Sequence, residues 1–559
     1  MPAERPFSTA ATTRSDRRCV DLWSLREDVL VDAGDPAGPV VLSGRWGETR
    51  LHRAGPLVRE ALRRMSLGPI SLANVVAELT AESSVRPSSP GGRTATAADE
   101  QAEILMLLHR LRHLVVRSLT LEDAEQPLLS VVPIVQSARY RPGTFDRSRA
   151  VRLSRFAFLR SEGEGFVLES PVSLYRVVVH GPEAAWVIGM LGRAHTLDEI
   201  VAAVPLTTPV VAEIVAHLLG TGMVLAAEPG SAEPGSAELE SDEPRPAERE
   251  SAVRALPSRT GADDGGRGAD SVPVFAEDTD PALLSWGAVD LLFHSRSTLG
   301  RHDADFGATY PLAGRLPPAP AVKPLPDGPR LLLPRPSLSE VTAADAPLTT
   351  VVEERRSIRS YGSEPLTAAV LGEFLYRALR VRGLPERHGE GRHEEEYSDR
   401  PYPSGGRAYE LEFYLTVRDC AGIPPGTHYY APLEHCLVRV GDEGPDAATA
   451  ELLAEAQISA GLDTPPAVVI TITSRIHRLS WKYSGLPYSL TLKHVGAVIQ
   501  NLYLIGTAMG LASCALGSGD IELAARTTGT DWLTEPSVGG FALGVAPEAV
   551  TNHPCKAHS

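Results

Sequence analysis

The chain has few cysteines and no motif that would pair them. Its 559 residues include five cysteines at wide spacing, none in a CxxC pair: Cys19, Cys420, Cys436, Cys514 and Cys555. An odd number of scattered cysteines predicts neither a disulfide framework nor a zinc ribbon. The first residues also have no apolar segment of the kind found in secretory signals. We therefore expect a cytoplasmic protein.

Long hydrophobic runs, excess positive charge and a dinucleotide motif are also missing. The most apolar stretch, 489–512, is interrupted by polar residues that would be costly in lipid, namely Lys493, His494, Gln500 and Asn501. This predicts a buried helix of a soluble domain and no membrane partner. The net charge of −16 argues against binding to nucleic acid phosphates. No GxGxxG opens a strand–helix unit, so a Rossmann nicotinamide site is not supported.

Low-complexity stretches divide the chain. Residues 84–100, 228–270 (with EPGSAEPGSAE) and the proline-rich 314–336 are typical of insertions, linkers and extended tethers. The length predicts about three domains. We expect a disordered N-terminus at 1–18, strand-and-helix blocks at 19–135 and 150–227, a disordered linker at 228–284, a connecting helix and tether at 285–347, and an α+β domain at 348–552.

The two front blocks share one pattern of short strands followed by helices. In the first, ILMLLHRLRHLVVRSL has apolar residues at helical spacing, from Ile104 to Leu114. In the second, a helix over PVVAEIVAHLLG closes on a strand. Two such units in tandem resemble winged-helix peptide-binding modules, the PqqD-like RiPP recognition elements. The resemblance implies leader-peptide binding by strand addition, and the alternative is a scaffold without peptide contact.

Three later segments carry chemistry. RRSIR brings Arg355, Arg356, Ser357 and Arg359 together, which suits a phosphate, although a basic helix end is often only a solvated face. PSGGR (403–407) is a tight turn before the strand LEFYLTV. Residues 463–520 hold a buried strand, Trp481-Lys482-Tyr483, a long helix and a Gly/Ser turn.

Taken in this order, RRSIR, PSGGR, WKY, GAVIQNLYL and GLASCALGSGD resemble the SagB and cyanobactin-oxidase (ThcOx) branch of the nitroreductase family. That resemblance implies a central antiparallel sheet, a helical dimer core and FMN at a homodimer interface. The residues that match the cofactor-binding motifs are Arg355, Arg356, Ser357 and Arg359, then Pro403, Ser404, Gly405 and Arg407 in a turn that often comes from the partner subunit, and Ala515, Leu516 and Gly517 against the isoalloxazine.

The Lys-Tyr pair of azoline dehydrogenases matches Lys482 and Tyr483. The resemblance implies oxidation of peptide thiazolines or oxazolines to thiazoles or oxazoles, beside a cyclodehydratase that acts on the same precursor peptide. The ring proton needs a base, and Lys482 serves only if its pKa falls, which burial and nearby arginines would favour. Otherwise Lys482 is a surface lysine and Tyr483 a packing aromatic.

Two rival hypotheses stay open: a general NAD(P)H-dependent nitro- or quinone reductase, and an inert scaffold of a peptide-modifying complex. His388, His393 and Glu394–Glu396 could suggest a metal site, but a mobile charged loop, a candidate lid, fits the pattern better, and we expect no metal. We expect Cys514 to be a small apolar filler and His494 a satisfied core histidine.

Overall fold

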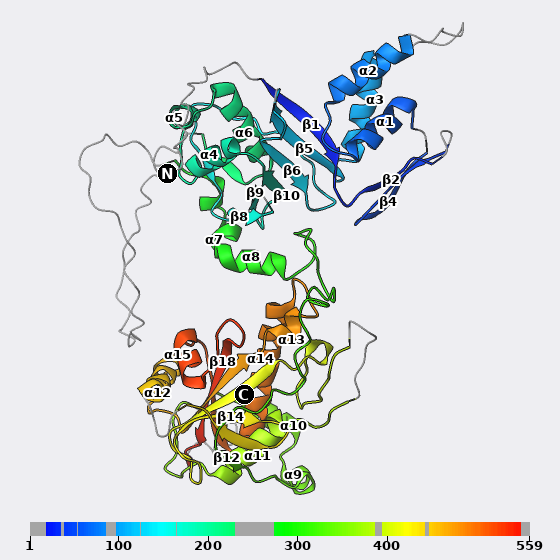
Figure 1. Ribbon diagram of the computed structural model, residues 1–559. Coiled ribbons are helices and arrows are strands. Elements are labelled where there is room, and N and C mark those ends of the chain that lie inside the picture. Colours follow the sequence, from blue (N-terminus) through cyan, green and yellow to red (C-terminus); the bar gives the residue numbers. More distant parts are fainter. Residues whose placement is uncertain are drawn as a thin grey trace, which may run out of the picture. The chain divides into compact units, whose positions relative to one another are not determined.

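The computed structural model describes residues 18–34, 38–52, 54–84, 97–122, 124–163, 165–229, 273–385, 394–441 and 447–548. These residues fall into two compact units, Met1–Asp303 and Ala304–Ser559 (Figure 1). The expectations for the N-terminus, for most of the 228–284 linker and for His388 and His393 lie outside the described residues.

Unit 1 is organised around one antiparallel sheet with strand order β1-β5-β6-β10-β9-β8. Its strands are β1 (Cys19–Leu25), β5 (Val115–Leu121), β6 (Leu129–Pro133), β8 (Phe158–Glu162), β9 (Gly165–Glu169) and β10 (Tyr175–Val179). The first three come from the 19–135 block and the other three from the 150–227 block, so the two blocks share a sheet. The winged-helix interpretation of each block stays a prediction.

Smaller elements complete unit 1. Beside the main sheet lie a three-stranded sheet, the pair β7–β11 and helices: β2 (Leu30–Asp32), β3 (Val40–Gly44), β4 (Gly47–Leu51), α1 (Pro56–Met65), α2 (Leu72–Ser84), α3 (Ala97–Arg110), β7 (Val151–Leu153), α4 (Pro182–Met190), α5 (Leu197–Ala203), α6 (Thr208–Gly220), β11 (Val224–Ala226), η1 (Ala276–Asp278), α7 (Pro281–Leu284) and α8 (Ala288–Arg296). The helix predicted over 104–119 was too long, because it ends at Arg110. The β-branched pair Val115–Val116 begins strand β5 instead.

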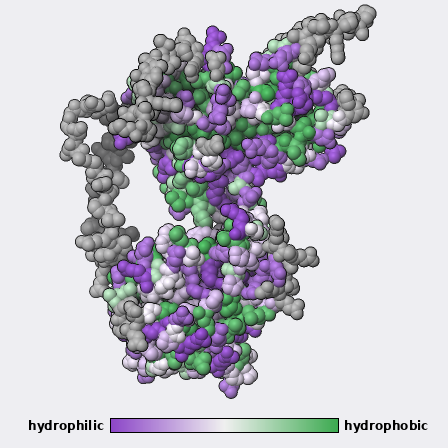
Figure 2. All heavy atoms as spheres, viewed as in Figure 1, coloured by the Kyte–Doolittle hydropathy of each residue, from purple (hydrophilic) through white to green (hydrophobic). Residues whose placement is uncertain are grey.

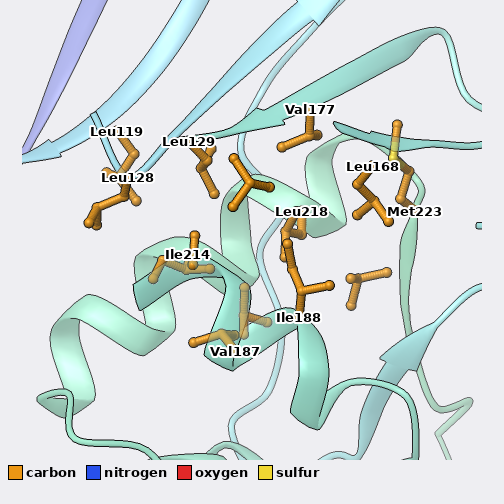
Figure 3. Close-up of a cluster of buried hydrophobic side chains, with 14 of the residues drawn as sticks. Leu119, Leu128, Leu129, Leu168, Val177, Val187, Ile188, Ile214, Leu218 and Met223 are labelled. Atoms are coloured by element: carbon orange, nitrogen blue, oxygen red, sulfur yellow. The ribbon is translucent and has the colours of Figure 1, made fainter. Parts of the chain in front are cut away.

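The main core of unit 1 forms where α4 and α6 cover the sheet. Figure 3 shows strand residues Leu129, Leu168 and Val177 facing helix residues Val187, Ile188, Ile214 and Leu218. The helical residues recur at three- and four-residue spacing, so one face of each helix is buried.

Unit 2 is built on an antiparallel sheet with the order β12-β15-β14-β13-β16-β18-β17. Its elements are β12 (Arg330–Leu332), α9 (Leu338–Ala344), α10 (Leu348–Glu354), α11 (Ala368–Leu379), η3 (Gly405–Arg407), β13 (Leu411–Val417), β14 (Gly426–Ala431), β15 (Cys436–Arg439), α12 (Ala447–Ala460), β16 (Val468–Ser474), α13 (His477–Ser480), α14 (Pro487–Ala508), β17 (Leu511–Leu516), α15 (Ile521–Thr528) and β18 (Ser537–Val545). The predicted central antiparallel sheet is confirmed.

Helices pack on both faces of this sheet, which explains why β13 and β16 are buried along their whole length. Alternate residues of β16 divide between the faces: Ile470 and Ile472 join the core with α11 and α14, while Val469 packs with α12 and α15. The apolar stretch 489–512 is mainly α14, as predicted. Among the described helices, none is long and apolar enough to cross a membrane. On the face drawn in Figure 2, polar and apolar residues are interspersed over each unit.

Candidate functional site

The arginine-rich loop directly follows α10 and is held by a tyrosine of α14. The hydroxyls of Ser357 and Tyr503 lie 2.7 Å apart, and the Ala515 backbone N–H donates to the Tyr503 oxygen at 2.8 Å. The Arg355 guanidinium lies 5.2 Å from the centre of the Tyr503 ring. Tyr503 therefore joins two of the predicted cofactor-binding segments, RRSIR and Ala515–Gly517.

Arg359 lies on the other side of this loop, near the end of α12. Its Nε donates to the Ala460 carbonyl at 2.8 Å, and its own carbonyl accepts from the backbone of Asp463 at 3.3 Å. The side-chain contacts recorded for Arg355 and Arg359 include no carboxylate among the described residues. Their charges are thus available to an anion. Nearby, burial raises the pKa of the Cys514 thiol, which suits the expected filler and not a nucleophile.

A cavity of about 270 Å³ begins where β17 ends. Its wall includes Leu516 and Gly517 of the third predicted segment, together with the glycines of β18, Gly539 and Gly540. A Cβ on Gly517 would meet nothing within 4 Å, so a flat ligand can approach the backbone there. Leu452, Val469, Val495 and Ile499 supply apolar parts of the remaining wall, while Glu455 and Asp520 add carboxylates to it.

The second group of predicted residues meets around the PSGGR turn. Gly406 has a φ of +62°, and a Cβ there would overlap the Tyr483 hydroxyl and lie 3.3 Å from Nζ of Lys482. The turn therefore lies directly against the Lys-Tyr pair, and glycine is required for both the backbone conformation and the contact. These segments are far apart in sequence, and the fold brings them together.

His494 of α14 fixes the turn. The Gly405 N–H donates to its Nε2 at 2.7 Å, and its Nδ1 lies 2.7 Å from a carboxylate oxygen of Glu410. Because Nε2 accepts, Nδ1 is the protonated nitrogen and donates to Glu410. Glu410 is fully buried, and its other oxygen accepts from the Ser404 hydroxyl at 3.4 Å. The expectation of a satisfied histidine agrees with this arrangement, which also gives His494 a positioning task.

Lys482 is a buried ammonium paired with Glu395. Only 8% of Lys482 and 3% of Glu395 are exposed, and Nζ donates to Oε1 of the carboxylate. The same oxygen accepts from the Tyr397 hydroxyl at 2.9 Å. The rings of three tyrosines, Tyr310, Tyr397 and Tyr483, lie 5.5–5.9 Å from Nζ. Lys482 is therefore enclosed by one carboxylate and three aromatic rings.

This environment overturns one expectation. Burial does act to lower the pKa of Lys482, as predicted, but the hydrogen bond and charge of Glu395 outweigh it, so the pKa is raised above its ordinary value. Burial also raises the pKa of the Tyr483 hydroxyl. In this state Lys482 is a cation and Tyr483 is neutral. The surface-lysine alternative does not fit a side chain with this burial.

Buried polar side chains of the α13 segment hold the pair in place. The Arg478 guanidinium donates to three carbonyls from separate segments, those of Ala319, Glu396 and Ala408. Burial and then the charge of Arg475 lower the pKa of Arg478 to about 10, so it stays protonated at neutral pH. The Trp481 indole donates to the Leu316 carbonyl at 2.9 Å. The acidic run and the proline-rich tether are thereby fastened beside Lys482.

The two groups lie at different levels of α14. His494 contacts the turn, and Tyr503, nine positions later, contacts the arginine loop. At about 1.5 Å per residue, these levels are separated by about 13.5 Å along the helix axis. The predicted residues therefore form two clusters within one chain, one anion-binding in character and one with acid–base groups.

Sequence reasoning missed the partners that organise both clusters, namely Tyr503, Glu410, Glu395, Tyr397 and Tyr310. Glu395 was noted only as part of a charged loop. Residues 394–396 are in fact described and hold Lys482, whereas His388 and His393 lie outside the described residues. Among the described residues, no group of three His, Cys, Asp or Glu side chains could hold a metal ion.

Both units contain residues that match models of known protein families. Residues 352–545 match the model of the nitroreductase family, and residues 151–244 match the model of the cyanobactin oxidase ThcOx. A candidate nitroreductase of Methanocaldococcus jannaschii is 30% identical over 183 residues, which are 33% of this chain and 82% of that protein.

Solved structures align over part of the chain. A candidate nitroreductase of Ralstonia eutropha is 21% identical and covers 42% of this chain and 100% of its own, with a TM-score of 0.31. The microcin synthetase complex McbBCD of E. coli, with truncated pro-MccB17 bound, is 20% identical and covers 48% and 95%, with a TM-score of 0.30. A candidate nitroreductase of Desulfovibrio desulfuricans in complex with FMN is 16% identical and covers 38% of this chain and 94% of its own, with a TM-score of 0.24.

The archaeal relative, 82% of which is covered by this chain at 30% identity, establishes the family. The chain belongs to the nitroreductase family of oxidoreductases, in the branch of SagB- and ThcOx-type proteins.

Proposed function

We propose that the protein is an FMN-dependent dehydrogenase that oxidises thiazoline or oxazoline rings in a ribosomally made peptide to thiazoles or oxazoles. The observation that carries this proposal is the contact between the PSGGR turn and Lys482–Tyr483. It sets the buried Lys482 and the half-buried Tyr483 against a turn whose backbone can approach a flat ligand. A general reductase that takes hydride from NAD(P)H has no evident need for such a pair.

The described residues fit a flavin phosphate and ring. Arg355, Arg356 and Arg359 supply three guanidinium groups within five residues, and two of these have no recorded carboxylate contact among the described side chains. The cavity at Leu516–Gly517 offers open backbone and a wall that is partly apolar, with Val469, Val495 and Ile499 among its residues. We propose that Ser357 and Ala515, both fixed by Tyr503, complete the binding of the cofactor.

A bound flavin would supply a two-electron acceptor for the hydride that leaves the azoline ring. The chain's own residues have to accept the proton from the adjacent ring carbon. Because Lys482 is an ammonium, it can do this only after passing its proton along the hydrogen bond to Glu395. A substrate that excludes water favours this transfer, since a neutral pair costs less than an ion pair in a dry site. Lys482 then takes the ring proton, and the Tyr483 hydroxyl orients the ring.

The separation of the two clusters supports a homodimer. If the PSGGR turn of one subunit completes the flavin site of the other, the anion-binding cluster and the acid–base cluster of each site come from different chains. We further propose that the protein works beside a cyclodehydratase that makes the azolines and that unit 1 recognises the precursor peptide. Oxygen is the expected electron acceptor.

The test is mass spectrometry of a defined azoline peptide after incubation with the yellow, flavin-loaded protein. We expect each ring to lose two hydrogens with the wild type. Lys482→Ala should keep the flavin absorbance but lose the mass change, and its melting temperature should fall by several degrees because the Glu395 carboxylate is left buried without its partner. Arg355→Ala should instead be purified with little flavin. Undiminished oxidation by Lys482→Ala would remove the acid–base role of this residue.

Two other outcomes would replace the proposal. Rapid flavin reduction by NAD(P)H without any change in the azoline peptide would indicate a general nitro- or quinone reductase. A colourless protein that takes up no FMN on titration would indicate an inert scaffold.

A further inference from the structure

A second cavity, in unit 1, has a lining unlike the rest of this acidic chain. It has a volume of about 230 Å³ and is lined by residues from α3, β1, β5 and the segment after β6: Trp23, Leu105, Leu108, His109, Arg112, Val115, Arg117, Arg139, Tyr140 and Arg141. Four of these ten side chains are arginines, and no carboxylate is among them. In a protein with a net charge of −16, this is a strong local excess of positive charge. We call it the arginine pocket.

Only one of the four arginines has a recorded carboxylate partner among the described side chains. Arg117 bonds to Asp21 at 2.8 Å, and its guanidinium lies 3.7 Å from the centre of the Trp23 ring. Arg112 lies 3.2 Å from the His109 ring, and Arg139 donates to backbone carbonyls, the nearer at 3.0 Å. Arg141 is exposed. Three guanidiniums therefore face the cavity and its mouth without a neutralising carboxylate from the described part of the chain.

These like charges act on one another. Partial desolvation, followed by the charges of Arg139 and Arg141, lowers the pKa of Arg112. Burial and the charges of Arg139 and Arg112 also lower the pKa of the neighbouring His113. Such crowding costs free energy in the free protein, and an anionic ligand would relieve it.

The apolar side chains that line the arginine pocket favour an anion that also carries apolar groups. Trp23, Tyr140 and the 42% exposed Leu105 offer aromatic and aliphatic surface between the cations. Aromatic and arginine side chains in a concave site are typical anchors for a protein ligand. The volume suits one or two inserted side chains and is below the usual range of about 300–1,000 Å³ for small-molecule pockets.

We propose that the arginine pocket binds an acidic segment of the peptide substrate, with one apolar side chain against Trp23 and Tyr140 and flanking carboxylates on Arg112, Arg139 and Arg141. This inference rests on the proposed peptide substrate but not on the oxidation chemistry. Nucleic acid is the weaker fit, because the net charge opposes it and the cations surround a small hollow instead of following a strand.

The test is fluorescence anisotropy with the full-length protein. The probe is a short fluorescein-labelled peptide of glutamate and leucine. We expect saturable binding that weakens as salt is added. Replacing the glutamates of the probe by glutamine should abolish binding, and replacing the leucines by serine should weaken it several-fold.

Variants then locate the site. Arg112→Ser combined with Arg141→Ser should weaken the probe about tenfold, since each lost charge-assisted contact changes affinity by a few-fold. Arg147→Ser combined with Arg193→Ser is the matched control, because both arginines are exposed in unit 1 outside the pocket and the net charge changes equally. We expect the control to bind the probe like the wild type.

Equal binding by the pocket variant and the control would overturn the proposal. So would an unchanged affinity for the glutamine probe, or tighter binding of duplex DNA or anionic phosphatidylglycerol vesicles that the same pocket variant abolishes. None of these measurements needs turnover. Failure of azoline oxidation therefore leaves this test intact, and failure of this test leaves the oxidation assay intact.

Discussion

Replacing Glu395 by glutamine should remove the only carboxylate recorded in contact with the Lys482 ammonium among the described residues. At about 4 Å and an effective dielectric constant near 20, one such pair is worth about 4 kcal/mol of attraction. The two side chains are 10% and 3% exposed, so the variant would leave a charge buried with little solvent. Because a neutral amide is cheaper to bury than a carboxylate and the three tyrosine rings remain, we expect a net loss of stability of about 3 kcal/mol, at the low end for a broken buried pair.

For a unit of this size, that loss corresponds to a fall in melting temperature of about 6–12 °C. The sign of the pH dependence is fixed by the raised pKa of Lys482. The stabilisation is fully present below the unfolded-state pKa of lysine and is lost as the pH rises through the raised folded-state value. The gap between the melting temperatures of wild type and variant should therefore persist through neutral pH and narrow in strongly alkaline buffer.

Turnover should change in a different way. In the wild type, Glu395 accepts the proton of the Lys482 ammonium within the site. The rate of azoline oxidation should therefore change little with pH around neutrality. In Glu395→Gln, burial still lowers the pKa of Lys482 while the hydrogen bond and charge of the carboxylate are lost, so the pKa should fall and oxidation should rise with pH as the neutral amine forms. The exposed neighbour Glu394→Gln is the control. Matching melting curves and matching pH profiles for Glu395→Gln and the wild type would refute both the ion pair and its role.

Two further substitutions test the parts around this pair. Tyr503→Phe removes the oxygen that Ser357 and Ala515 share, and the unpaired Ala515 N–H then costs about 1–3 kcal/mol. We therefore expect the variant to retain less flavin after gel filtration. A full flavin complement would contradict the link between the two segments. Gly406→Ala should abolish turnover while flavin stays bound, because the new Cβ displaces the Tyr483 hydroxyl. Gly461→Ala is the control, because Gly461 has the same left-handed backbone (φ +61°) but a Cβ there would meet no neighbouring atom, so this variant should keep activity. Equal losses of activity in both variants would show that backbone strain alone is responsible.

The sequence predicted the elements of unit 2 better than those of unit 1 because their signals are local. LEFYLTV and AVVITIT are apolar, β-branched runs that must be buried on both faces, and they became β13 and β16. In the front half, the helical spacing of 104–114 passes without a break into Val115–Val116, and only the pairing with β1 shows that a strand has begun. The pairing of β6 with β10 joins the two blocks in one sheet, which no pattern within either block could show.

In the candidate site, too, local sequence motifs could be predicted, whereas contacts between distant segments could not. The motifs could be found singly, but Lys482 and Glu395 are 87 residues apart, and Glu395 stands in a run of three glutamates whose composition predicts a solvated loop. What decides its burial is Arg478, which bonds the carbonyl of the next residue and draws the run against α13. Whether a charged run is buried or solvated therefore depends on the buried cation that contacts it, and its own sequence does not show which.

The pKa of Lys482 shows why this matters for mechanism. Desolvation lowers the pKa of a buried lysine and a carboxylate partner raises it, and each effect can be large. The direction of the net pKa shift is therefore unknown until the position of the partner is known. Sequence reasoning had the first effect and its direction correct, because the amine is buried among tyrosine rings. The second effect depends on one hydrogen bond from a distant segment, and it reverses the result. A lysine identified as a base by its motif thus needs its acceptor identified too, and in this chain that acceptor is Glu395.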